Sequence, residues 1–263
     1  MGSILIQGVA LNALNNDLFG TKHKILIAVS LLLIVGLYIL SRKIKLDMVC
    51  RILFYVGIAS EIVKIFYYIV ANEEKYGGVL PKTDLPFHLC SIQIIFIAIV
   101  NIAKSERLKR FIFSFMLPSC FFGGIAAILI ATSSARSTWI ITIQYFLYHI
   151  AISVFALRLF TDKELSFNIK DYFNCLKFLL GIMFFAIYIN SILYDGVSNI
   201  NFMYVVKPPQ DGLPYLNDDN GWLSYIIKYA ILVVGLVTLT YIKPIIDAIR
   251  ERVAKAKSTE KSE

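Results

Sequence analysis

The sequence contains little charge for its length. Charged residues make up 17% of the 263 residues, whereas soluble domains contain about a quarter. Apolar residues make up 58%, and the mean hydropathy is +0.70. The apolar excess is concentrated in blocks of about 16 to 23 residues, the length that crosses the hydrocarbon core of a bilayer at roughly 1.5 Å per residue. This composition excludes an ordinary soluble domain and predicts an integral membrane protein.

Motifs of the common soluble enzymes are also missing. The sequence contains no phosphate-binding loop, no Cys/His set with metal-ligand spacing and no serine in a nucleophile-elbow pattern. No internal repeat is detectable, which argues against an inverted-repeat transporter. We therefore expect no metal and no cofactor.

Cysteine is scarce, and a disulfide framework is not expected. Cys50 and Cys175 lie near the predicted cytoplasmic surface, Cys120 lies in mid-membrane, and only Cys90 approaches the outer face. No pair therefore shares an oxidising compartment. The first 20 residues also lack the basic start, apolar run and cleavage site of a secretory signal.

What the sequence does contain is a series of seven apolar blocks. They predict an all-α fold, a polytopic bundle of seven transmembrane helices. Residues 1–24 are expected to form an outer N-terminal segment, and residues 243–263 a basic cytoplasmic tail. Within the transmembrane domain, residues 25–242, the helices are predicted at 25–40, 49–71, 86–103, 111–131, 138–160, 173–194 and 222–242.

The distribution of Lys and Arg predicts the orientation. Eighteen of the 26 basic residues fall in the tail and alternate loops on one side, and six fall on the other. Basic residues are enriched on the cytoplasmic side, so the N-terminus is predicted outside and the C-terminus in the cytoplasm of a cell-membrane protein. The net charge of +8 is then explained by membrane topology and by contact of the basic loops with anionic lipid headgroups, and not by nucleic acid. The oligomeric state is left open.

Ionisable residues inside the membrane are costly, so each is a functional candidate. Glu61 and Lys64 are three residues apart in the second block and can form an ion pair. They either hold helices together or form the charged wall of a cavity that opens outward. His149 lies close to the midplane in the fifth block, where it is either a hydrogen-bonded core residue or a functional group.

The third block begins with a second group of candidates. Pro86 suits the first turn of a helix, which places His88 and Cys90 in the following turn near the outer surface. Helix N-termini lower thiol pKa values, so Cys90 is either a reactive thiolate or an inert cysteine behind a helix cap. Gln93 shares its face, whereas His88 does not. His149 is a candidate base from another helix, but it lies roughly 9 Å deeper, so a tilted or sunken third helix is required.

Further polar residues map to the same outer half of the bundle. Asn190 lies near the outer end of the sixth block, and Asn201, Tyr204 and Lys207 lie in the long loop of residues 195–221. The Tyr, Phe, Met and Pro content of this loop argues against disorder and predicts that it folds over the outer mouth of the bundle. Polar groups from several segments at one depth suggest a shared pocket.

Four strings in the sequence resemble a known family. They are LPFHLCSIQ at residues 85–93, YFLYH at 145–149, the Ile189-Asn190 pair, and NFMYVVKPP at 201–209. They are similar to the YwaF-like family, also called the transmembrane-protein-164 family, and the resemblance is to its bacterial members. Members are predicted seven-helix membrane proteins, and a eukaryotic relative is described as a phospholipid acyltransferase with an essential cysteine.

The resemblance implies roles for individual residues. Cys90 would be the nucleophile that accepts an acyl chain as a thioester, and His149 or His88 would be its base. Asn190 and Asn201 would be oxyanion donors, and Lys207 a phosphate contact. The sequence departs from the family where Phe202 follows Asn201, because a tyrosine is expected there.

Three functions remain open on the sequence. The first is acyl transfer on membrane phospholipid in a pocket open to the outer side, with a substrate-binding set of Gln93, Asn190, Asn201, Tyr204, Lys207, Glu61 and Lys64. The second is non-catalytic transport or binding of a small polar solute, with Glu61, Lys64 and His149 lining the path. The third is a structural or signalling partner whose polar groups only join helices.

Overall fold

The computed structural model describes residues 19–131, 138–209, 213 and 215–260, and all regular secondary structure in this part of the chain is helical. The all-α prediction is therefore confirmed. Residues 1–18 of the predicted outer segment and 261–263 of the predicted tail lie outside the described residues. The helices that cover the seven apolar blocks are α2 (Thr21–Ser41), α3 (Leu46–Ile65) with the π-helix η1 (Phe66–Ala71), α5 (Leu89–Ile102), α6 (Glu106–Leu129), α7 (Trp139–Thr161), α8 (Ile169–Leu193) and α9 (Trp222–Thr240).

Among the described residues, four further helices lie in the connections and the tail. The short helices α4 (Glu73–Tyr76) and η2 (Lys82–Asp84) lie between α3 and α5, and η4 (Phe202–Tyr204) lies between α8 and α9. The predicted tail is a long helix, α10 (Ile242–Glu260). We call the end of the bundle that holds α4, η2 and η4 the outer end and the opposite end the inner end, after the orientation predicted from the sequence.

Five helices in the described part of the chain, α2, α6, α7, α8 and α9, are long and apolar enough to cross a membrane. This agrees with a membrane protein but leaves the count of seven unconfirmed. Two predicted spans do not meet the same standard. Charged residues interrupt α3, which carries Asp47, Arg51, Glu61 and Lys64, and α5 has only 14 residues.

Several helices begin before the apolar blocks that predicted them, because their capping residues lie in polar loops. The side chain of Ser105 accepts a hydrogen bond from the backbone N–H of Leu108 at the start of α6. Asn168 and Asp171 form a capping box at the start of α8. The carboxylate of Asp171 also accepts two hydrogen bonds from Arg110 of α6, at 2.6 and 2.9 Å. This buried carboxylate therefore joins the inner ends of two helices.

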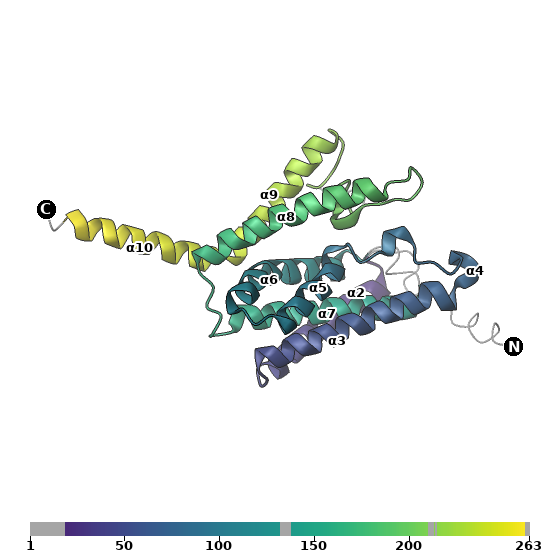
Figure 1. Ribbon diagram of the computed structural model, residues 1–263, viewed down its shortest axis with the longest axis horizontal. Coiled ribbons are helices and arrows are strands. Elements are labelled where there is room, and N and C mark those ends of the chain that lie inside the picture. The colour runs from purple at the N-terminus through teal and green to yellow at the C-terminus, as the bar shows by residue number, and fades with distance from the viewer. Residues whose placement is uncertain (1–18, 132–137, 210–212, 214, 261–263) are drawn as a thin grey trace.

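Helix α6 lies at the centre of the bundle, in contact with α5, α7, α8 and α9. Figure 1 shows α8 and α9 as a pair beside the other helices and α10 extending away from them. Met116 and Cys120 of α6 are fully buried. The rings of Phe115 and Phe178 stack with centroids 4.5 Å apart, which joins α6 to α8.

The start of α5 is sunk into the bundle. The prediction that this helix begins at Pro86 is wrong, because His88 has an extended backbone and Leu89 is the first helical residue. Leu89 lies against Gly123 of α6, and the adjacent Gly124 lies against the backbone oxygen of His149 in α7. The first turn of α5 therefore packs on the part of α6 that lies against α7 at His149, as the sunken third helix required for a pair of Cys90 and His149 would do.

Candidate functional site

An ion pair on the outer half of α3 is the first part of the candidate site. Nζ of Lys64 lies 2.9 and 2.8 Å from the two carboxylate oxygens of Glu61, as their spacing predicts. The two side chains are only 12% and 19% exposed, respectively. The next residues form the π-helix η1, an irregularity that is frequent at functional sites.

Lys64 acts on more than its partner. The charge of its ammonium group reaches the carboxyl group of Asp84, the imidazole of His88 and the thiol of Cys90. All three belong to the segment that enters α5. Backbone without helical hydrogen bonds is tolerated at membrane depth only where protein buries it or where it lines an aqueous cavity. The non-helical segment before α5 therefore has to be buried by protein or line a cavity, and it brings the three groups within reach of the Lys64 charge.

Cys90 is the second residue of α5, and its side chain lies at the positive end of the helix dipole. It is the only one of the four cysteines that is not fully buried. The backbone N–H and the hydroxyl of Ser91 lie beside its sulfur. Its backbone oxygen accepts a hydrogen bond of 2.8 Å from the hydroxyl of Tyr148, which ties the first turn of α5 to α7.

His88 is the N-cap residue of α5 and lies between polar and aromatic groups. Its Nε2 is 3.3 Å from the backbone oxygen of Thr83. Its ring packs against the rings of Phe202 and Tyr204, with centroids 5.0 and 5.8 Å away. These contacts bring the long outer loop over the start of α5, as the sequence predicts.

The conformation of that loop is strained where it meets His88. Met203 and Tyr204 both have positive φ values, 55° and 54°, which non-glycine residues rarely adopt. Burial, followed by the charge of a Cys90 thiolate, raises the pKa of the Tyr204 hydroxyl, which therefore stays protonated at neutral pH and can donate a hydrogen bond. Strained backbone persists only where its surroundings hold it.

Helix α9 stabilises part of this strained loop. Three of its residues, on one face, donate hydrogen bonds to three successive backbone oxygens of the loop. Trp222 donates to Val205 over 2.9 Å, and Tyr229 donates to Met203 over 2.8 Å. Between them, the hydroxyl of Tyr225 donates to the backbone oxygen of Tyr204.

Two asparagines predicted as oxyanion donors also hold the loop. The amide group of Asn190 donates to the backbone oxygens of Ala186 and Phe202, at 2.7 and 3.0 Å, and its oxygen accepts from the N–H of Phe202 at 2.7 Å. Asn201 accepts from the N–H groups of Val206 and Lys207, at 3.2 and 3.3 Å, and donates to the backbone oxygen of Lys207 at 2.9 Å. Both amides are engaged with backbone, and their role as oxyanion donors stays a prediction.

Two further predicted residues, His149 and Gln93, form hydrogen bonds with other parts of the bundle. His149 is buried, and its Nδ1 lies 2.7 Å from the backbone oxygen of Tyr145. No hydrogen bond joins it to Cys90 among the described residues, but Tyr148 contacts both, since its ring centroid lies 5.9 Å from that of His149. Gln93 donates to Ser119 of α6 at 3.1 Å, and its buried oxygen has no hydrogen-bond partner in the described structure.

Comparison with known proteins places the chain in a family. Residues 18–241 match the family model of the TMEM164 family, which is most of the chain. The chain belongs to the TMEM164 family. No curated protein and no solved structure matches it. The match runs from α2 to the end of α9, so all the residues described above lie within the part shared with the TMEM164 family, whereas α10 lies outside it.

Three residues of this TMEM164-family site were not among the sequence-predicted candidates. They are Asp84, the Tyr68 hydroxyl close to it, and Tyr148. Burial raises the pKa of Asp84, against the opposing effects of the Thr83 hydroxyl, the charge of Lys64 and the Tyr68 hydroxyl. The spacing of Tyr68, four residues after Lys64, places both on one helical face and could have indicated its involvement. Lys207, in contrast, is exposed on the loop.

Proposed function

We propose that this protein is a membrane-embedded acyltransferase that uses Cys90 to move an acyl chain between phospholipids. The observation that carries the proposal is the position of Cys90. The residue is partly exposed, lies at the N-terminus of a sunken helix and is within reach of the charge of Lys64. Burial of the sulfur favours the neutral thiol, whereas the helix N-terminus and the nearby cation act against burial and favour the reactive thiolate. The resemblance to YwaF-like proteins and to their cysteine-dependent relative is a second support.

The proposal includes a topology. All seven helices cross the cell membrane, with the N-terminus outside and the C-terminus in the cytoplasm, as in the bacterial proteins that the sequence resembles. Support comes from the 18-to-6 distribution of basic residues, which only an odd number of spans sorts in this way. In this arrangement α3 tolerates Glu61 and Lys64 because they pair, and α5 is short because the segment before it returns into the bundle.

The reaction needs no oxidant and no cofactor. The thiolate attacks the carbonyl carbon of an acyl ester in the donor phospholipid, so that a C–S bond forms and the ester C–O bond breaks. The proton released by the thiol passes to the departing oxygen, which leaves a lysophospholipid and a thioester at Cys90. The hydroxyl of a second lysophospholipid then attacks the thioester, breaks the C–S bond and returns its proton to the sulfur.

The chain offers groups for each part of this chemistry. Backbone N–H groups at the start of α5, including that of Ser91 beside the sulfur, are suited to the negative charge on the carbonyl oxygen in the transition state. The base is His88 or His149. His88 is two residues away in sequence and shares the influence of Lys64, whereas His149 reaches the first turn of α5 through Tyr148. We assign contacts with the lipid phosphate to Lys207 and the Tyr204 hydroxyl of the outer loop.

The test is the detection of an acyl adduct on Cys90. The purified full-length protein is incubated with a lipid extract and analysed by intact-mass and peptide mass spectrometry. We expect a thioester on Cys90 that hydroxylamine removes, no adduct in Cys90→Ser, and an unchanged adduct in Cys175→Ala, which alters a buried cysteine of α8. A Cys90→Ser variant that is labelled as strongly as the parent by an acyl-mimetic thiol probe would disprove the assignment.

One observation favours a second candidate, the passage of a small polar solute or proton. Polar contacts continue along α3 and α7, because Gln144 donates a hydrogen bond to Ser60, next to the pair of Glu61 and Lys64. With His149 on the same helix as Gln144, these groups could line a path. Uptake by the protein in vesicles distinguishes the two functions, because transport should respond to Glu61→Gln and ignore Cys90→Ser.

A further inference from the structure

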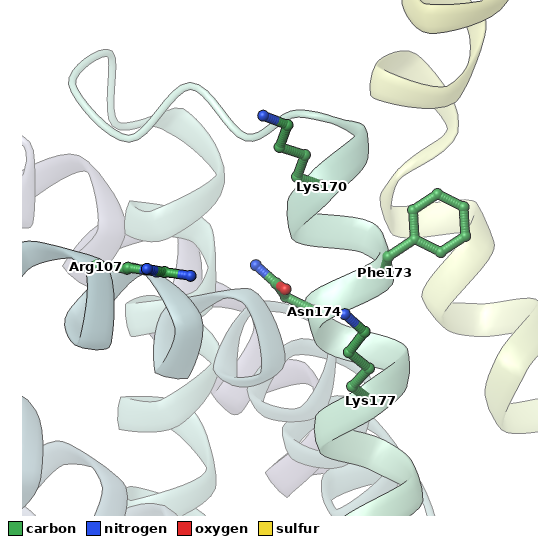
Figure 2. Close-up of a pocket in the computed structure, with 5 residues that line it drawn as sticks. All are labelled: Arg107, Lys170, Phe173, Asn174 and Lys177. Carbon is green, nitrogen blue, oxygen red and sulfur yellow. The ribbon is translucent and has the colours of Figure 1, made fainter.

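A basic cavity lies at the inner end of the bundle, far along the helices from Cys90. It has a volume of about 730 Å³, within the usual range for small-molecule sites. It is lined by Arg107 of α6 and by Lys170, Phe173, Asn174 and Lys177 of α8. Figure 2 shows the side chains of Arg107 and Asn174 pointing toward each other from the two helices.

The three cations of this cavity carry no compensating charge. In the described part of the chain, no ion pair includes Arg107, Lys170 or Lys177. The two acidic residues nearest in sequence are already engaged. Glu106 pairs with Lys109 at 2.8 Å, and Asp171 is bound by Arg110 and by the backbone of Asn168. Three unpaired cations around one cavity favour an anion there.

The cavity continues into a surface suited to an acyl chain. Phe173, Lys177, Leu180 and Phe184 follow one another at spacings of four, three and four, so they form a single stripe along α8. Phe173, Leu180 and Phe184 are each a little more than half exposed. In a membrane-spanning helix, such a stripe faces lipid. A molecule with a phosphate in the cavity can therefore lay a hydrocarbon chain along α8.

We propose that this cavity binds the phosphate headgroup of an anionic phospholipid from the inner leaflet, independently of the proposed acyl transfer. The guanidinium group of Arg107 offers paired donors that match phosphate oxygens, and the two ammonium groups and the Asn174 amide add further donors. Basic pockets between transmembrane helices on the cytoplasmic side are established sites for such headgroups. A zwitterionic headgroup has no net charge and cannot neutralise three cations. The cavity should therefore prefer a lipid with a net negative charge.

The test measures lipids bound to the intact protein by native mass spectrometry. The full-length protein in detergent is titrated with phosphatidylglycerol or phosphatidylcholine of the same chain length. We expect phosphatidylglycerol to bind at least about tenfold more tightly, and Lys170→Gln/Lys177→Gln to abolish this preference. Lys43→Gln/Lys45→Gln is the matched control, because it removes the same charge from exposed lysines of the α2–α3 loop, and it should keep the preference.

Two results would overturn the proposal. If the control variant loses the preference as fully as the test variant, the binding reflects diffuse surface charge and not this cavity. If inorganic phosphate or glycerol phosphate at millimolar concentration displaces the lipid completely, the cavity takes free phosphate and the stripe on α8 contributes nothing. Thermal unfolding of each variant without lipid checks that the double substitution leaves the protein folded.

Discussion

The candidate site at the outer end and the basic cavity at the inner end hold their charges in opposite ways. At the outer end, the charged groups of Glu61 and Lys64 are paired and largely buried, and the backbone before α5 folds inward to meet them. In the basic cavity, the cations of Arg107, Lys170 and Lys177 are exposed and belong to no ion pair of the described chain. A buried charge changes the chemistry of its neighbours, whereas an exposed charge mainly attracts a soluble or lipid anion.

This difference indicates where each kind of function resides. The outer end loses regular helix at η1, at the segment before α5 and at η4, and these irregular segments bring side chains from distant positions together. The inner end keeps its helices intact, with capping residues at Ser105 and Asn168. The candidate reactive groups therefore gather where the fold departs from regular helices, and the proposed lipid-binding cations lie on two regular helices.

The largest expected effect comes from removing the charge of Lys64 at the outer end. Lys64→Gln should slow formation of the acyl adduct on Cys90 by about a hundredfold, the scale seen when one group that stabilises developing charge is lost. Lys64→Arg, which keeps the charge, should retain most of the rate. The measurement is the initial rate of adduct formation followed by mass spectrometry.

Two further variants separate chemistry from folding in that experiment. Glu61→Gln/Lys64→Gln removes both members of the pair, so no unpaired charge is left buried, and it should fold but remain slow. Lys228→Gln alters a lysine of α9 that bonds to Asn217 over 2.6 Å instead, and it should react at the parental rate. If the double variant reacts as fast as the parent, Lys64 has no part in activating the thiol.

The sequence predicted those features of the two sites that depend on spacing within one helix. A helix of the described chain covers each apolar block, although the number of blocks that cross the membrane stays a prediction. The three-residue separation of Glu61 and Lys64 predicted their ion pair, which the structure confirms. Capping residues explain most of the boundary errors, because α6 and α8 continue into polar loops that an apolar count ignores.

The parts that could not be predicted depend on contacts between distant positions. The sequence alone suggested that Pro86 starts a helix, yet the chain turns there instead, and the helix begins at Leu89 against Gly123. That shift packs the first turn of α5 on the part of α6 that lies against His149. The bond from Tyr148 to Cys90 spans 58 positions, and no periodicity within either helix encodes it.

A second prediction compares close packing near the site with an open face of α8. A Cβ atom added at Gly124 would lie 2.3 Å from Oγ of Ser153 and 3.1 Å from the backbone oxygen of His149. Gly124→Ala should therefore destabilise the protein by about 1 to 3 kcal/mol, the usual cost of overpacking. Gly181→Ala, in the exposed middle of α8 with nothing within 4 Å, should be neutral or stabilise it by up to about 1 kcal/mol. Thermal unfolding in detergent measures the stability of both variants. If the two substitutions lower the stability equally, α6 and α7 are not packed this closely at Gly124.

The smallest expected effect concerns Asp84, the buried carboxyl group of the outer end. Burial raises its pKa, so the folded protein holds this proton more tightly than the unfolded chain does. The stability that Asp84 contributes is then fully present below its unfolded pKa, near 4, and is lost as the pH rises through its folded pKa. Asp84→Asn should match the parent in Tm near pH 4 and exceed it by about one or two degrees near pH 7. Asp247→Asn, in the tail helix outside the bundle, should follow the parent at both values. A variant that is less stable than the parent at neutral pH would mean that the attraction of Lys64 for the Asp84 carboxylate outweighs the cost of its burial.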